Sequence, residues 1–135
     1  MKKALLITVL FFFSLISYSQ KDKVYTSLEE ALKNPSDVFI LALNNKKLTE
    51  VPESIIRFTN LMTLDLASNK LSSMPENISS LKNLSELNLS NNKFNTLPEN
   101  ITQLTTLIEL DFSNNNCSFL PGTITKLSNL KILYF

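Results

Sequence analysis

The chain has 135 residues, of which 44% are hydrophobic and 19% charged, enough for one globular domain. Thirteen basic and twelve acidic residues leave a formal charge of +1, so no strong field favours nucleic acid or an anionic membrane. The sequence has no histidine and a single cysteine, which excludes an internal disulfide and a catalytic thiol with a histidine base. The folded domain must therefore be held together by packing.

Residues 1–19 have the pattern of a secretory signal peptide. A short positive start, MKK, precedes the apolar run Ala4–Ile16, and the small residues Ser17 and Ser19 stand before the expected cleavage point. The alternative is an uncleaved membrane anchor, but this run makes about 20 Å of helix against a hydrocarbon core of about 30 Å. We expect cleavage after Ser19, no membrane insertion afterwards, and a secreted, periplasmic or cell-envelope location.

Residues 20–37 are predicted to form an N-terminal capping segment. The sequence SLEE places Ser27 and Glu30 in the spacing of a capping box, which begins a short helix. A small apolar stripe follows, and the pair Asn34–Pro35 is expected to end the helix. Because the first unit of a stack would expose its core, we interpret this helix as its cover.

The rest of the chain repeats itself with a period of 23 residues. Leu61, Leu84, Leu107 and Leu130 are spaced by this interval, and prolines, isoleucines and asparagines recur at the same period. The prediction is four full units and one partial unit, which span residues 38–60, 61–83, 84–106, 107–129 and 130–135.

Each unit has two halves with different patterns. The first half reads LxxLxL, and its alternating end predicts a short strand with one buried face. In the second half, Pro75 can start a helical turn, and Ile78 and Leu81 share one face of it. One such unit cannot bury its apolar face alone, so the units are expected to stack in parallel around a continuous core.

A column of asparagines is expected to support the turns that follow the strands. Asn69, Asn92 and Asn115 recur there, and an amide side chain can bond backbone groups inside the stack. Lys46 takes this place in the first unit, so that turn is predicted to be looser or solvated. Cys117 shares a column with leucines and phenylalanine, so we interpret it as a small buried hydrophobe.

The stretch LMTLDLASNKLSSMPENISSLKN, Leu61 to Asn83, resembles the 23-residue leucine-rich repeat LxxLxLxxNxLxxLPxxIxxLxx. The resemblance covers residues 38–135, and the flank YTSLEEALKNPSDV is similar to the lead-in of many secreted bacterial proteins of this family. It implies an α/β solenoid, a horseshoe arc with parallel strands on the concave side and short helical or 3₁₀ turns on the convex side. It also implies that macromolecules bind on the concave side.

The C-terminal unit is expected to leave apolar side chains in water. Leu130, Leu133 and Phe135 would lie at an unpaired strand edge. Two interpretations stay open: the edge pairs with another chain by self-association, or the sequence is a fragment of a longer array.

The outward strand positions are the candidate partner-binding site. Neighbouring strands lie about 4.8 Å apart, so four carboxylates on the middle strands would form a patch about 10–15 Å across. This patch suits a basic or amphipathic partner with an aromatic anchor at one end, although a merely solvated face or a Ca²⁺ site would use similar residues. The candidates are Thr63, Asp65, Glu86, Asn88, Glu109, Asp111, Ile132 and Tyr134.

Two further columns are expected to balance each other on the surface. One holds lysines after the asparagine turn and the other holds glutamates after the proline; they are Lys47, Lys70 and Lys93, and Glu53, Glu76 and Glu99.

The sequence favours an exported, non-catalytic protein–protein interaction module that needs no cofactor or metal. The partner is expected to be a protein, not a nucleic acid. The alternative is a structural or adhesive piece of a longer array that contacts cell-surface protein or carbohydrate. An enzyme is disfavoured because the sequence has no histidine, no glycine-rich phosphate loop and no metal-ligand cluster.

Overall fold

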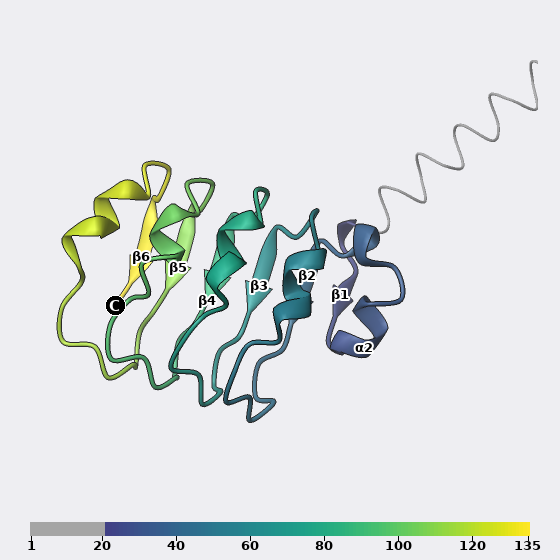
Figure 1. Ribbon diagram of the computed structural model, residues 1–135, viewed down its shortest axis with the longest axis horizontal. Coiled ribbons are helices and arrows are strands. Elements are labelled where there is room, and N and C mark those ends of the chain that lie inside the picture. The colour runs from purple at the N-terminus through teal and green to yellow at the C-terminus, as the bar shows by residue number, and fades with distance from the viewer. Residues whose placement is uncertain (1–20) are drawn as a thin grey trace, which may run out of the picture.

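The computed structural model describes residues 21–135, so the predicted signal peptide at residues 1–19 lies outside the described residues. Its main feature is one open parallel sheet whose strands follow one another in chain order (Figure 1). The strands are β1 (Val24–Tyr25), β2 (Ile40–Ala42), β3 (Thr63–Asp65), β4 (Glu86–Asn88), β5 (Glu109–Asp111) and β6 (Ile132–Tyr134). Because β2 to β6 lie one period apart, the predicted solenoid of stacked units is confirmed.

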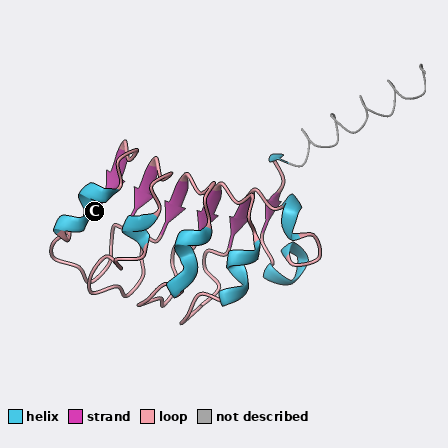
Figure 2. Cartoon of the chain, turned by 45° about the horizontal axis from the view of Figure 1, so that its top comes forward, coloured by secondary structure: helices cyan, strands magenta, loops and turns pink. Residues whose placement is uncertain are grey.

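Short 3₁₀ turns form the second layer, opposite the sheet (Figure 2). A proline directly precedes η2, η3 and η5 and fixes the backbone angle there, whereas η4 begins three residues after Pro98; each of these turns is too short for a stable α-helix. The turns are η1 (Pro35–Asp37), η2 (Glu53–Arg57), η3 (Glu76–Ser80), η4 (Ile101–Gln103) and η5 (Gly122–Lys126).

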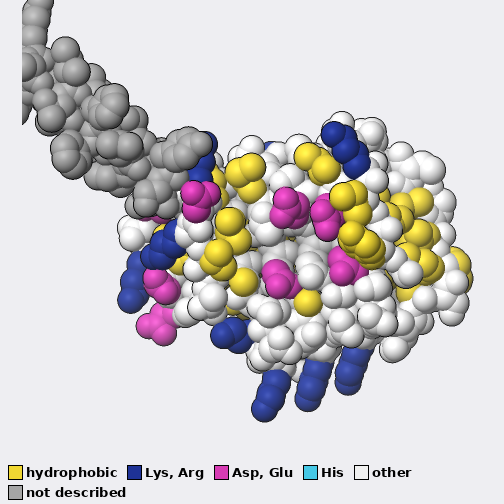
Figure 3. All heavy atoms as spheres, turned by 180° about the vertical axis from the view of Figure 1, so that it is seen from behind, with side chains coloured by type: hydrophobic (Ala, Val, Ile, Leu, Met, Phe, Trp, Pro, Cys, Tyr) yellow, Lys and Arg dark blue, Asp and Glu magenta, His cyan; other side chains and the backbone are white. Residues whose placement is uncertain are grey.

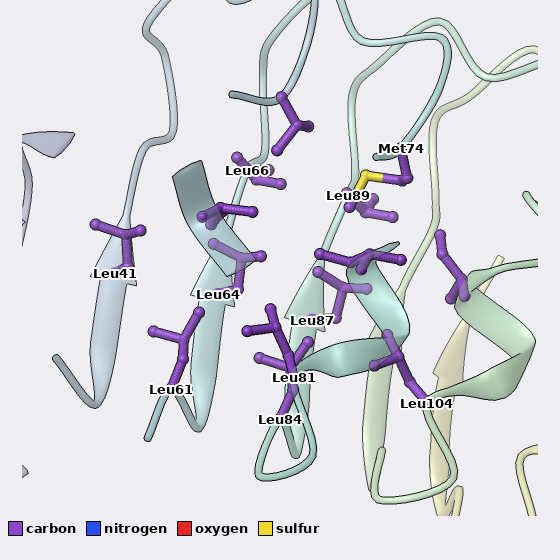
Figure 4. Close-up of a cluster of buried hydrophobic side chains, with 14 of the residues drawn as sticks. Leu41, Leu61, Leu64, Leu66, Met74, Leu81, Leu84, Leu87, Leu89 and Leu104 are labelled. Atoms are coloured by element: carbon purple, nitrogen blue, oxygen red, sulfur yellow. The ribbon is translucent and has the colours of Figure 1, made fainter. Parts of the chain in front are cut away.

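The core lies between these two layers and runs through the whole stack. Leu64, Leu87 and Leu110 point inward from the middle of their strands and are fully or almost fully buried. They pack against isoleucines and leucines of the 3₁₀ turns, and Figure 4 shows these side chains stacked from one unit to the next. Burying one leucine contributes about 1.5–3 kcal/mol, so each repeat is stabilised mainly by its neighbours.

The N-terminal cap is a short helix, α2 (Leu28–Ala31). Its predicted capping box is half formed: the Oγ of Ser27 accepts a bond from the N–H of Glu30 at 3.4 Å. The carboxylate of Glu30 instead accepts a bond from Lys23 at 2.9 Å, which raises the pKa of that lysine. The strand β1 was not predicted; its buried Tyr25 is the register partner of Leu41 and extends the core.

The C-terminal unit is less enclosed than the middle ones. Leu130 and Leu133 are half-buried and Phe135 is exposed, so the expectation that all three face water holds only for the last. Cys117 is half-buried, and its thiol donates to the carbonyl of Phe119 at 2.9 Å. The expectation of a small buried hydrophobe therefore holds in part, since Cys117 packs against the core but keeps some exposure.

Candidate functional site

The outward side of the sheet, called the concave face from here, is organised by strand register. Parallel pairing without slippage places equivalent positions of every unit side by side. The two outward columns are Ile40–Thr63–Glu86–Glu109–Ile132 and Ala42–Asp65–Asn88–Asp111–Tyr134. The acidic residues come from β3, β4 and β5, so they lie within two strand spacings, about 10 Å.

A shallow hollow of about 230 Å³ lies at the centre of the concave face. Two core leucines, Leu64 and Leu87, contribute to its lining and were not among the candidates. Ile132 and Tyr134 belong to the same face on β6 but do not line the hollow. The structure brings six of the candidates together around it: Thr63, Asp65, Glu86, Asn88, Glu109 and Asp111.

Local hydrogen bonds fix how two of the carboxylates point. One oxygen of Asp111 accepts from the N–H and the hydroxyl of Ser113, at 3.0 and 2.6 Å. Asp65 accepts from the N–H of Ala67 at 2.9 Å in the same way. One carboxylate oxygen of each aspartate therefore accepts hydrogen bonds from the turn after its strand. The other oxygen carries no hydrogen bond within the described chain.

The two glutamates of the hollow are held by fewer hydrogen bonds than the two aspartates. Glu86 accepts from the hydroxyl of Thr63 at 3.0 Å, a bond that links β3 to β4 across the face. Glu109 is half-buried on the next strand, directly beside Glu86 in the register. No hydrogen bond or ion pair to its carboxylate is found among residues 21–135, so this side chain can turn toward a ligand.

No basic side chain of the described residues neutralises this patch. The ion pairs of residues 21–135 are Lys23–Glu30 and Lys126–Glu99, both away from the hollow. Figure 3 shows the acidic side chains together on one face, with hydrophobic side chains next to them. The concave face therefore presents several uncompensated negative charges to whatever approaches it.

Exposed apolar side chains flank the hollow at both ends of the sheet. Ile132 and Tyr134 are 41% and 51% exposed on β6, next to the acidic residues of β5. At the other end Val24 is 49% exposed on β1, beside Ile40. Val24 was missed because it precedes the first repeat, where the 23-residue period gives no guide.

The asparagine column supports the concave face from inside. The Nδ2 of Asn92 donates to the carbonyls of Leu66 and Leu89, both at 3.0 Å, and its Oδ1 accepts from the N–H of Leu71 at 3.0 Å. Asn69 and Asn115 make equivalent bonds in their own units. Each amide ties its unit to the preceding one, which holds the strands in register.

The turn of the first unit differs from the others, but it is hydrogen-bonded to the second unit and not looser or solvated as expected from Lys46. Asn45 and Lys47 both have positive φ, 57° and 59°, whereas each of the three later full units has one such residue. The N–H groups of Lys46 and Leu48 both donate to the Oδ1 of Asn69, at 3.0 Å each. The bond from Leu48 is the one that each asparagine of the column accepts from the preceding unit, and the bond from Lys46 is an additional one.

The expected balance between the lysine and glutamate columns was wrong. None of the lysines at positions 47, 70 and 93 forms an ion pair within residues 21–135, and Glu99 pairs with Lys126 of the next unit at 3.2 Å. The lysines follow the turn at the end of each strand, while the glutamates belong to or flank the 3₁₀ layer. The sequence period shows which residues share a column, but not which columns face each other.

Two further features of residues 21–135 concern metals and membranes. No group of three or more acidic, cysteine or histidine side chains is placed to hold a metal ion, so the geometry gives no support for a Ca²⁺ site. Within the same residues, no helix has the length and apolarity needed to cross a bilayer.

Stacked parallel strands, opposing 3₁₀ turns and an internal asparagine column define a solenoid repeat protein. Two family models match this chain, both described as leucine-rich repeat: one over residues 38–94 and the other over residues 106–127. The chain belongs to the leucine-rich repeat family. None of the curated proteins compared with the chain matches it.

Three solved structures show the same architecture. A leucine-rich repeat protein of Leptospira interrogans is 39% identical over 84% of this chain, with a TM-score of 0.80. Internalin C2 from Listeria monocytogenes is 27% identical over 76%, with a TM-score of 0.64. The leucine-rich repeat ectodomain of the receptor kinase SOBIR1 from Arabidopsis thaliana is 35% identical over 74%, with a TM-score of 0.61. The matched part spans 29%, 43% and 56% of those chains.

Proposed function

We propose that this chain is an exported, non-catalytic module that binds a protein partner in the acidic hollow of its concave face. Leucine-rich repeat domains are generally protein-interaction modules and typically lack enzymatic activity. The export part of the proposal rests on the sequence of residues 1–19. The observation that carries the binding part is the group of carboxylates in the hollow, which no basic side chain of residues 21–135 neutralises.

The arrangement of Glu86 and Glu109 supports a basic partner. The two residues are direct register partners on β4 and β5, and like charges facing each other across neighbouring strands destabilise a sheet. A cationic group placed between them would remove this repulsion and gain two charge-assisted hydrogen bonds. A positively charged ligand would therefore be favoured at this position over a neutral one.

The size and surroundings of the hollow define the partner further. A volume of about 230 Å³ admits one long basic side chain, and an arginine guanidinium can bond a carboxylate through two parallel N–H groups. Ile132 and Tyr134 lie beside the acidic residues and can cover apolar side chains of the same partner. The best match is an amphipathic protein segment with an arginine or lysine near its centre.

Charge reversal of the hollow tests this proposal. The variant Glu86→Lys with Glu109→Lys should lose capture of its partner from the envelope and growth medium of the native cells. A matched control, Glu53→Lys with Glu76→Lys, makes the same change of charge on exposed residues of the 3₁₀ layer and should keep capture. Equal capture by both variants, with unchanged circular dichroism, would show that the partner binds elsewhere.

Asp111 is the less suitable residue to reverse, although it also lines the hollow. Its side chain accepts two hydrogen bonds from Ser113, so a lysine there would also disturb the turn after β5. Glu86 loses only the bond from Thr63 when it is replaced, and Glu109 loses none that the structure shows. The glutamate pair therefore separates a loss of binding from a loss of structure.

A further inference from the structure

A second charged surface lies on the rim of the solenoid, where the chain turns after each strand. Lys47, Lys70 and Lys93 occupy the same position in three successive units, and all three are exposed. Figure 3 shows basic side chains projecting in a row from one rim, apart from the acidic side chains of the concave face. We call these three residues the lysine rim.

Backbone hydrogen bonds fix the spacing of the lysine rim. The N–H of Lys70 donates to the carbonyl of Leu48 at 2.7 Å, and the N–H of Lys93 donates to that of Leu71 at 2.8 Å. The same bond recurs at Asn116, which continues the row in the fourth unit. The lysines therefore repeat at the pitch of the stack, about 4.8 Å, on a rigid support.

The ammonium groups of the lysine rim form no ion pair in the part of the chain that the structure describes. Neither ion pair of residues 21–135 includes one of them. Cations of the same sign at this spacing repel one another, and in the free protein only solvent and salt screen them. A ligand with negative charges at a similar spacing would neutralise all three together.

A row of uncharged polar side chains runs beside the lysine rim. Asn91 and Asn114 are exposed and have φ of 55°, a left-handed conformation that asparagine tolerates well. Asn45 and Ser68 occupy the equivalent positions in the first two units, with φ of 57° and 56°. These amides and the hydroxyl can donate to and accept from the hydroxyl groups of a ligand.

The chemistry of this rim selects among polyanions. None of the exposed large hydrophobic side chains of residues 21–135 belongs to the turns that carry the three lysines, and the exposed Phe119 follows only in the fourth unit, so the lysine rim itself offers no aromatic surface for stacking nucleic-acid bases. It also offers no apolar side chain that could enter a membrane surface. The remaining class of polyanion is a ligand that offers regularly spaced negative charges and hydroxyl groups for hydrogen bonds.

We propose that the lysine rim binds an acidic polysaccharide with a carboxylate on each sugar. The chain of sugars runs across the units, with its carboxylates on the lysines and its hydroxyl groups on the neighbouring amides. This site lies on a different surface from the acidic hollow, so the polysaccharide and the protein partner bind independently.

Polygalacturonate is a suitable probe, and its affinity for the full chain can be measured by calorimetry at several salt concentrations. Replacing all three rim lysines by glutamine should weaken binding about tenfold or more, since three ion pairs are lost. A variant with all three changed to arginine should keep binding. A control that changes Lys33, Lys82 and Lys131 to glutamine removes the same charge from exposed positions elsewhere and should bind within about twofold of the unaltered chain.

Three results would overturn the proposal. The first is no binding of polygalacturonate by the unaltered chain. The second is equal weakening by the rim and control variants, which would mean that overall charge alone matters. The third is equally tight binding of poly-glutamate, which would assign the rim to an acidic peptide. Charge reversal of Glu86 and Glu109 should leave polygalacturonate binding intact or make it stronger. The proposal for the acidic hollow and the proposal for the lysine rim can therefore be refuted independently.

Discussion

Replacing Asn92 with alanine removes four hydrogen bonds from the interior of the stack. Its Nδ2 donates to the carbonyls of Leu66, Leu89 and Ser90, at 3.0, 3.0 and 3.2 Å, and its Oδ1 accepts from the N–H of Leu71 at 3.0 Å. At a net value of about 0.5–1.5 kcal/mol for each bond, the free energy of unfolding should fall by about 2–6 kcal/mol.

Three of the four backbone groups that bond Asn92 keep another hydrogen bond when its side chain is removed. The expected loss of unfolding free energy is therefore in the lower half of that range, at about 2–4 kcal/mol. The carbonyls of Leu66 and Leu89 still accept from Asn69 and Asn115. The carbonyl of Ser90 also accepts from a backbone N–H, that of Ser68. The amide of Leu71 is different, because the structure shows no other acceptor for it, so its hydrogen exchange should accelerate most.

Urea unfolding followed by far-ultraviolet circular dichroism measures this loss, with the slope of the transition as a check that the same surface unfolds. Asn115→Ala should cost less, because Asn115 is half-buried and water can replace part of its bonds. Asn95→Ala is the control, an exposed asparagine expected to change stability by less than about 0.5 kcal/mol. If Asn92→Ala unfolds like Asn95→Ala, the asparagine column does not hold the units together.

Three further predictions concern the core, the hollow and export. Leu87→Ala should lower the free energy of unfolding by about 2–5 kcal/mol in urea, because the side chain is buried between neighbouring units; a loss under about 1 kcal/mol would contradict the stacked core. Glu109→Gln should raise stability by about 0.2–1 kcal/mol through relief of repulsion with Glu86, yet weaken partner capture; lower stability would refute the repulsion. A reporter fused after residues 1–25 should reach the medium or envelope with an N-terminus at Gln20, whereas an uncleaved, membrane-bound fusion would favour the anchor.

The repeated part of the fold could be predicted from the sequence because one physical requirement recurs in every unit. A strand that buries one face must alternate, and Leu64 with Leu66 sets that alternation for its unit. A period of 23 then fixes the register, since parallel pairing puts equivalent positions side by side. The same logic placed the outward columns, which is why six candidates line one hollow.

Features outside the period could not be predicted in this way. The strand β1 has two residues and no counterpart in the repeats, so the exposed Val24 was missed. Glu30 bonds Lys23 instead of completing its capping box, and Lys23 lies in the segment before the helix, which the capping-box pattern does not include. The period also does not show where the face is hollowed, so Ile132 and Tyr134, which do not line the hollow, were grouped with the six candidates that do.

A bulky group attached to the concave face gives the most direct test of where the partner binds. In a Cys117→Ser background, Asn88→Cys places a thiol in the hollow and Ser80→Cys places one on the exposed 3₁₀ layer. Because Asn88 accepts two hydrogen bonds from Ser90, the unlabelled Asn88→Cys variant is measured as well and should keep capture. Labelling each variant with a large maleimide dye changes shape without reversing any charge. We predict that the dye at position 88 abolishes partner capture while the dye at position 80 leaves it unchanged. Full capture with the hollow blocked would contradict binding at the concave face.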